Sequence, residues 1–209
     1  MKQLNIDRIN AKAPYKVSED GKQLVFETRH GLHYEIRFFE EQPIGGCETW
    51  QFSFAKAEDM ATPEDPYVRF TLFAVIDEFF TDNDNVMLYI CDTSDSREAA
   101  RNRLFIRWFK QSAEPNRFTI RSASTTIEGQ GFFAAIIVEN RNPLLTDITA
   151  DFDQTAVSLT NKTSEYISIG SSLIKKKYPP RHPQDASALC IRHCLTYRHR
   201  IAGRQQKII

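Results

Sequence analysis

The sequence predicts an α+β fold: an antiparallel, aromatic-rich sheet of about six or seven strands with two main helices packed on one face. Two observations lead to this fold. Short segments that alternate apolar and polar residues follow one another at the beginning of the chain, which is the pattern of half-buried strands. Two longer segments, 66–80 and 95–110, repeat apolar residues at helical spacing instead. A basic C-terminal extension follows this core.

The first four strands are expected to form an antiparallel meander with one aromatic face. Residues 14–17 and 22–28 make the first hairpin, with Gly21 in its turn. The segments 32–38 and 50–54 then place aromatic or aliphatic residues at every second position. Because alternate side chains of a strand point to the same face, this pattern gathers the rings on the covered side of the sheet.

The centre of the sequence is expected to hold a helix, a buried strand and a second helix. The first helix begins after Asp65, a capping residue that a proline follows, and apolar residues cover most of its circumference. The apolar run Val86–Cys91 has the length and composition of a buried strand. An acidic turn follows, in which Asp95 is the N-cap of the second helix and Glu98 completes a capping box.

Two more strands and a helix complete the predicted core. The strands cover 117–127 and 132–138, and the Gly-x-Gly between them is a hairpin turn, because no helix follows it as in a nucleotide-binding loop. Asp147 is expected to cap a helix with an apolar stripe. The segment 166–169 has the composition of a short strand, and Asp185 could cap a last helix.

Charge divides the chain into a core domain, 1–160, and a basic C-terminal extension, 161–209. The core carries 17 Lys and Arg against 25 Asp and Glu, a net charge of −8, whereas the extension carries 10 against 2, a net charge of +8. Such an extension can bind nucleic acid or another anionic surface, or dock on the acidic core or on a second copy of the protein. The composition alone leaves these alternatives open.

The extension supplies the candidates for contact with nucleic acid or for docking. Residues 175–207 contain tyrosines for stacking as well as cations for phosphates, but no known nucleic-acid-binding motif. We favour docking for that reason. The candidate residues are Lys175, Lys176, Lys177, Arg181, Arg198 and Arg200.

A second candidate site lies where the central strand meets its helix. Asp92, Asp95, Arg97 and Arg101 could form an anion or ligand pocket beside a helix N-terminus. The simpler interpretation, which we favour, is a structural ion-pair network, because a guanidinium on the apolar face of a helix must be paired. A catalytic role would need a convergent acid, metal or nucleophile, and the sequence indicates none.

No cofactor, metal or membrane association is expected. The spacing of Cys190, His193, Cys194 and His199 fits no common zinc motif. The N-terminal segment lacks the apolar stretch of a secretory signal, and no segment approaches the roughly 20 apolar residues of a transmembrane helix. The expected location is the cytoplasm.

The central stretch carries a resemblance. It combines Cys91-Asp92 and Asp95 with Arg97, Arg101 and Arg103, followed by Leu104-Phe105 and Trp108-Phe109. With the aromatic meander before it, this pattern resembles a family of small, functionally uncharacterised bacterial α+β domains over roughly residues 14–145, without the basic extension. The resemblance implies the fold and brings no activity with it.

These observations favour a non-enzymatic binding or interaction module over an enzyme. A protein partner or self-association is the first expectation. The alternative is a nucleic-acid-associated protein that uses the extension. A third possibility is an enzyme or anion-ligand site built on the four-residue cluster at 92–101.

Overall fold

The computed structural model describes residues 2–58, 65–91, 98–111, 114, 116–127 and 130–169. Within these ranges, side chains are described except at 91, 98–102, 125–127, 130–132 and 159–169.

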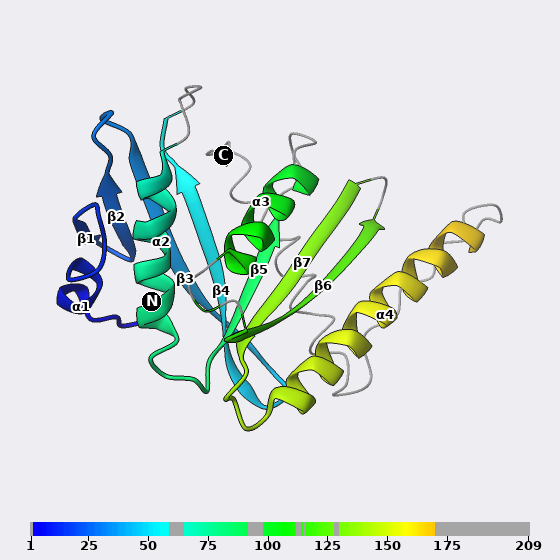
Figure 1. Cartoon of the computed structure of the whole chain (residues 1–209). Helices are drawn as coiled ribbons and strands as arrows, with labels where there is room; N and C mark the ends of the chain where they lie inside the picture. Colours follow the sequence, from blue (N-terminus) through cyan, green and yellow to red (C-terminus); the bar gives the residue numbers. More distant parts are fainter. Residues whose placement is uncertain are drawn as a thin grey trace.

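The core of the protein is a single mixed sheet of seven strands in the order β1-β2-β3-β4-β5-β7-β6 (Figure 1). All neighbouring strands are antiparallel except β4 and β5, which are parallel. With the helices that cover the sheet, this arrangement confirms the predicted α+β fold. The strands are β1 (Val17–Asp20), β2 (Gln23–Glu27), β3 (His33–Ile44), β4 (Cys47–Lys56), β5 (Val86–Cys91), β6 (Phe118–Ile127) and β7 (Gln130–Glu139).

In the described part of the chain, four helices cover the two faces of the sheet unequally. One face packs against α1, α2 and α3, and α4 packs on the opposite face. Figure 1 shows α2 and α3 side by side in front of the sheet, as the sequence predicts for its two main helices. The helices are α1 (Ile6–Asn10), α2 (Pro66–Phe79), α3 (Glu98–Lys110) and α4 (Leu145–Ile169).

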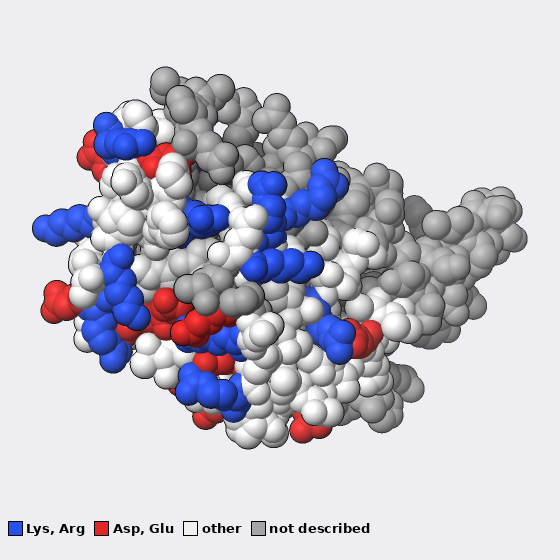
Figure 2. Space-filling view, viewed as in Figure 1, with Lys and Arg blue, Asp and Glu red and all other residues white. Residues whose placement is uncertain are grey.

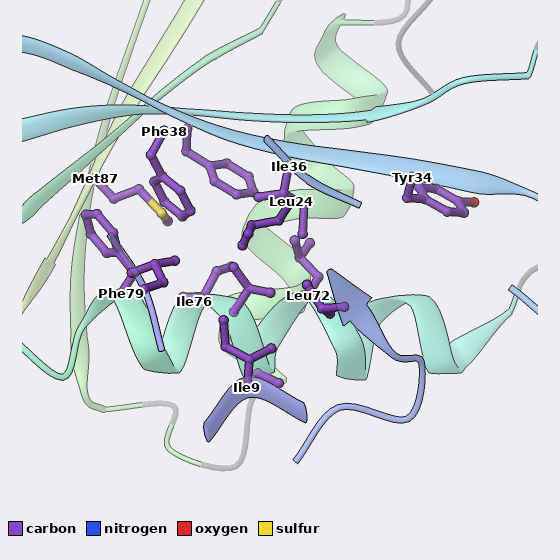
Figure 3. Close-up of a cluster of buried hydrophobic side chains, with 14 of the residues drawn as sticks. Ile9, Leu24, Tyr34, Ile36, Phe38, Leu72, Ile76, Phe79 and Met87 are labelled. Carbon is purple, nitrogen blue, oxygen red and sulfur yellow. The ribbon is translucent and has the colours of Figure 1, made fainter. Parts of the chain in front are cut away.

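The face under α1, α2 and α3 carries the aromatic core that the alternating pattern predicts. Phe26, Tyr34 and Phe54 stack in a row across β2, β3 and β4, with ring centroids 5.1 and 5.3 Å apart. Further along, Phe38 of β3 stacks on Phe79 of α2 at 4.7 Å. Figure 3 shows side chains of the sheet and of α2 converging in this core, with Ile9 of α1 closing it from below. Burial of these large side chains supplies most of the stability of the fold.

Helix α2 begins where its capping residue predicts. The side chain of Asp65 accepts a hydrogen bond from the backbone N–H of Tyr67 at 3.0 Å, and Pro66 occupies the first turn. The hydroxyl of Tyr15 also donates to the Asp65 carboxylate, which ties the segment before β1 to the start of the helix. One carboxylate thus satisfies a free helix amide and a partly buried hydroxyl together.

The opposite face has a smaller, aliphatic core under α4. Ile148 and Phe152 of this helix pack with buried side chains of β4, β5 and β7. The β3–β4 turn approaches the helix so closely that a Cβ at Gly45, whose φ is +58°, would lie 2.4 Å from the backbone nitrogen of Ile148. The N–H of Gly45 also donates to Asp151 at 2.7 Å. This turn therefore requires glycine both for its conformation and for its contact.

Three predictions about local structure are wrong. Helix α4 begins at Leu145, so Asp147 lies within its first turn and does not cap it. The first strand begins at Val17 rather than at Pro14, a residue that has no N–H to donate to a ladder. Residues 166–169 belong to the end of α4 and form no separate strand. Because α4 continues to Ile169, it passes through the proposed boundary at residue 160, and the division into two domains stays a prediction.

Candidate functional site

Most of the predicted site residues lie outside the described part of the chain. This applies to Asp92, Asp95 and Arg97, and to the cations of the extension: Lys175, Lys176, Lys177, Arg181, Arg198 and Arg200. Arg101 belongs to α3, but its side chain is among those outside the described set. Both predicted sites therefore stay predictions. The described residues contain two other groups of charged side chains, which sequence reasoning did not single out.

The first group joins the end of the β6–β7 hairpin to α2. Arg117 immediately precedes β6, and Glu139 ends β7 opposite Phe118. The Nε of Arg117 donates to Oε1 of Glu139 at 3.0 Å, and its Nη1 donates to Asp77 of α2 at 2.9 Å. The same Nη1 lies 3.5 Å from the carboxylate of Glu114. A single guanidinium thus connects three carboxylates from three segments.

A second guanidinium completes this group, which we call the Arg117 cluster: Asp77, Glu114, Arg117, Glu139 and Arg141. Arg141 donates from Nε to the same Oε1 of Glu139 at 3.0 Å. The side chain of Glu139 is 1% exposed, whereas that of Arg141 is 73% exposed, so an exposed cation covers a buried anion. The other carboxylate oxygen of Glu139 is buried and has no hydrogen-bond partner among the described residues.

All members of the Arg117 cluster except Asp77 line an open hollow of about 450 Å³. Asn116 and Asn140 complete its lining, and they bond to each other through the Asn140 side-chain amide and the Asn116 carbonyl. Burial raises the pKa of Asp77, and the nearby Arg117 lowers it only in part. The guanidiniums of Arg117 and Arg141 thus form ion pairs with the three carboxylates of the cluster. This arrangement is suited to holding β6 and β7 against α2, rather than to binding a further ion.

The second group is a row of cations on the outer side of α3, which we call the α3 stripe: Arg103, Arg107 and Lys110. Spacing of four and three residues places them on one side of the helix, opposite Phe105 and Phe109 in the core. All three are exposed, and no described carboxylate lies within ion-pair distance of any of them. Figure 2 shows Lys and Arg side chains gathered over α3, with acidic side chains gathered below them.

Contacts between α2 and α3 fix the position of the α3 stripe. Phe73 of α2 packs edge to face on Phe109, with ring centroids 5.1 Å apart. Arg69 of α2 donates from Nη1 to Gln111, the residue after α3, at 3.1 Å. The N-terminal half of α2 therefore lies close to the C-terminal end of α3.

Two other side chains with reactive groups, a histidine and a cysteine, have ordinary surroundings. His33 is exposed at the start of β3, and its hydrogen bond to Glu58 raises the pKa of the imidazole. Cys47 is a free, buried thiol next to the side chain of Asn142. In the described part of the chain, no group of three or more His, Cys, Asp or Glu residues is arranged to hold a metal ion.

One segment of the chain matches a known protein family. Residues 64–154 match the Family of unknown function (DUF6169). The matched segment runs from the cap of α2 into the first half of α4, so it contains both the Arg117 cluster and the α3 stripe, while the β1–β4 meander lies outside it. This agrees with the expected resemblance to an uncharacterised family and adds no activity. No curated protein and no solved structure matches the chain. None of the described helices is long and apolar enough to cross a membrane.

Proposed function

We propose that this protein is a non-catalytic binding module whose contact surface is the α3 stripe and whose partner is an anionic polymer. The observation behind the proposal is the contrast in pairing. Arg117 and Arg141 are matched by carboxylates, whereas the three cations of the stripe are exposed and have no carboxylate partner among the described residues. Exposed cations in a row attract an anion at little cost in desolvation.

The dimensions of the α3 stripe favour an extended anion over a compact one. Lys110 follows Arg103 by seven positions, so the row is about 10 Å long at the rise of an α-helix. One strand of a nucleic acid presents about three phosphates over that length. A small anion, by contrast, would reach only part of this open row.

Neighbouring charges limit the extent of this surface. Asp77 and Glu114 of the Arg117 cluster are both partly exposed, and the acidic side chains in Figure 2 lie below the cations over α3. An anionic polymer would be repelled from the lower part of this face. Its preferred path therefore follows α3 and the N-terminal half of α2.

Equilibrium binding of the full chain to end-labelled inorganic polyphosphate tests the proposal. Replacing Arg103, Arg107 and Lys110 with Gln together should weaken binding roughly tenfold or more, since three phosphate contacts and their released counterions are lost. Fluorescence anisotropy at low and moderate salt measures the effect.

Two charge-matched variants serve as controls. The first replaces Lys12, Lys16 and Lys22, which are exposed near α1 and the β1–β2 turn, with Gln. The second replaces 175–177 with Gln and tests the extension instead. Wild-type affinity in the first control is expected. Equal losses in the stripe variant and the first control would reject the proposal, because net charge alone would then explain the binding. A loss confined to the second control would assign the contact to the extension.

A further inference from the structure

Helix α2 carries an exposed aromatic ring one residue away from Arg69, the side chain that bonds to the end of α3. Phe70 is 49% exposed, although it belongs to α2, a helix with an otherwise well-packed apolar side. Its neighbour Arg69 is bonded to Gln111 at the end of α3, which brings this part of α2 next to Lys110. About half of the surface of this ring is exposed, and the cations at the outer side of the adjoining helix have no carboxylate partner among the described residues.

Each exposed aromatic side chain of α2 has an arginine against its ring. The guanidinium of Arg69 lies 5.1 Å from the centroid of Phe70, and that of Arg29 lies 5.5 Å from the centroid of Tyr67. Tyr67 is 44% exposed. Such cation–π contacts orient a ring without burying it. Among the described residues, no other aromatic ring stacks on Phe70.

We propose that the anionic polymer is a single-stranded nucleic acid, whose phosphates lie along the α3 stripe and one of whose bases stacks on Phe70. This inference rests on the proposed function and specifies its partner. Cationic rows with exposed aromatic rings beside them are the usual means of binding single strands, because every base has a π-face and stacking needs no particular sequence. Tyr67, three residues earlier on α2, offers a position for a further base.

A duplex fits this surface less well for two reasons. Its base faces are already stacked on one another, so Phe70 would gain no partner. Its second strand would also extend the negative charge beyond the narrow row of cations, towards the partly exposed carboxylates of Asp77 and Glu114. A single strand can follow the cations and avoid these acids.

The test compares three labelled probes on the full chain: a short oligothymidylate, a duplex of the same length and inorganic polyphosphate. The wild type should bind the oligothymidylate more tightly than the duplex. Phe70→Leu keeps an apolar side chain but removes the π-face, and it should weaken oligothymidylate binding about fivefold or more while leaving polyphosphate binding unchanged. Phe39→Leu is the matched control, because Phe39 is 44% exposed and alternates with the core residue Phe38, so it lies on the opposite face of the sheet.

The outcomes separate the two proposals. Unchanged oligothymidylate affinity in Phe70→Leu, or an equal loss in Phe39→Leu, would overturn the stacking inference. The proposed function would survive this result if the stripe variant still lost its affinity for polyphosphate. Preference for the duplex in the wild type would also overturn the inference. If none of the three probes binds to the wild type, the proposed function itself fails and the inference falls with it.

Discussion

The Arg117 cluster and the α3 stripe lie on the same side of the sheet, carry the same kind of side chain and belong to the same family-matched segment, yet they differ in pairing. Arg117 is four-fifths buried and bonded to carboxylates from two elements, whereas the cations of the stripe project into solvent. The number of arginines alone therefore says little about function in this protein. Whether a cation is paired and buried decides whether it can hold the fold together or attract a partner.

The backbone explains the difference. In the β6–β7 hairpin, the register sets Phe118 opposite Glu139, so Arg117 and the carboxylate meet at the end of the ladder. In α3, the core takes one side of the helix, and the described residues on the opposite side are exposed. Removing a charge should therefore affect folding at the first location and binding at the second.

The largest effect is expected when Arg117 is replaced with Leu. The change leaves the buried carboxylate of Glu139 with one guanidinium and deprives Asp77 of its partner, which should cost roughly 3 kcal/mol of unfolding free energy. Denaturant titration at neutral pH measures it. Arg141→Leu is the control and should cost well under half as much, because its side chain is 73% exposed. An Arg117 variant as stable as the wild type would remove the cluster from the account of stability.

A smaller effect is expected when the pH changes. The contributions of Asp77 and Asp65 to the unfolding free energy should then change in opposite directions. Burial raises the pKa of Asp77, so the folded state holds this proton more tightly than the unfolded chain does, and stability falls as pH rises past the ordinary range of an aspartate. The difference in unfolding free energy between Asp77→Asn and the wild type should therefore shift in favour of the variant as pH rises above the ordinary range of an aspartate.

Asp65 should behave in the opposite way. Burial alone would raise the pKa of this carboxyl, but its bonds from Tyr15 and from the N–H of Tyr67, together with the charge of Arg29, lower it on balance. Its stabilisation is present above the ordinary range of an aspartate and is lost as pH falls. Asp65→Asn should destabilise the protein near neutral pH, and the loss should shrink in acid. Thermal unfolding over a pH series measures both variants, and parallel curves for the two would contradict the assigned shifts.

The smallest effect on stability is expected from the α3 stripe. Single replacements of Arg103, Arg107 and Lys110 with Gln should each change the unfolding free energy by no more than about 0.5 kcal/mol, since these side chains are exposed and no described carboxylate pairs with them. The same denaturant titration applies. A marked loss would mean that the stripe contributes to folding, and the contrast with the Arg117 cluster would then disappear.

Local patterns in the sequence predicted local structure well and distant pairing poorly. The cap at Asp65 predicted the start of α2, and the alternating rings up to Phe54 predicted the meander. Both signals lie within a few residues of the structure they form. The parallel pairing of Phe52 with Tyr89 joins strands separated by a whole helix, and no short-range signal marks it. At 166–169, β-branched and aromatic residues suggested a strand, but continuation of an existing helix prevailed.

The charged groups were missed for related reasons. Arg117 and Glu139 are 22 residues apart and meet only through the hairpin register. Pairing the two predicted strands symmetrically about the turn between them could have suggested that Arg117 and Glu139 lie close together. The spacing of Arg103 and Arg107 is visible in the sequence, but the expected inward direction of Arg101 drew the site prediction to the other side of the helix. Unpaired exposure can be judged only once the rest of the fold is in place.

The salt dependence of binding tests the central claim most directly. For the full chain and a single-stranded oligonucleotide, the logarithm of the association constant should fall linearly with the logarithm of the salt concentration. Replacing the three cations of the α3 stripe with Gln should make that slope shallower by about 2, since each phosphate contact on a single strand contributes about 0.7. The matched change at Lys12, Lys16 and Lys22 should leave the slope as in the wild type. Identical slopes for the wild type and the stripe variant would contradict the claim that this helix holds the polymer.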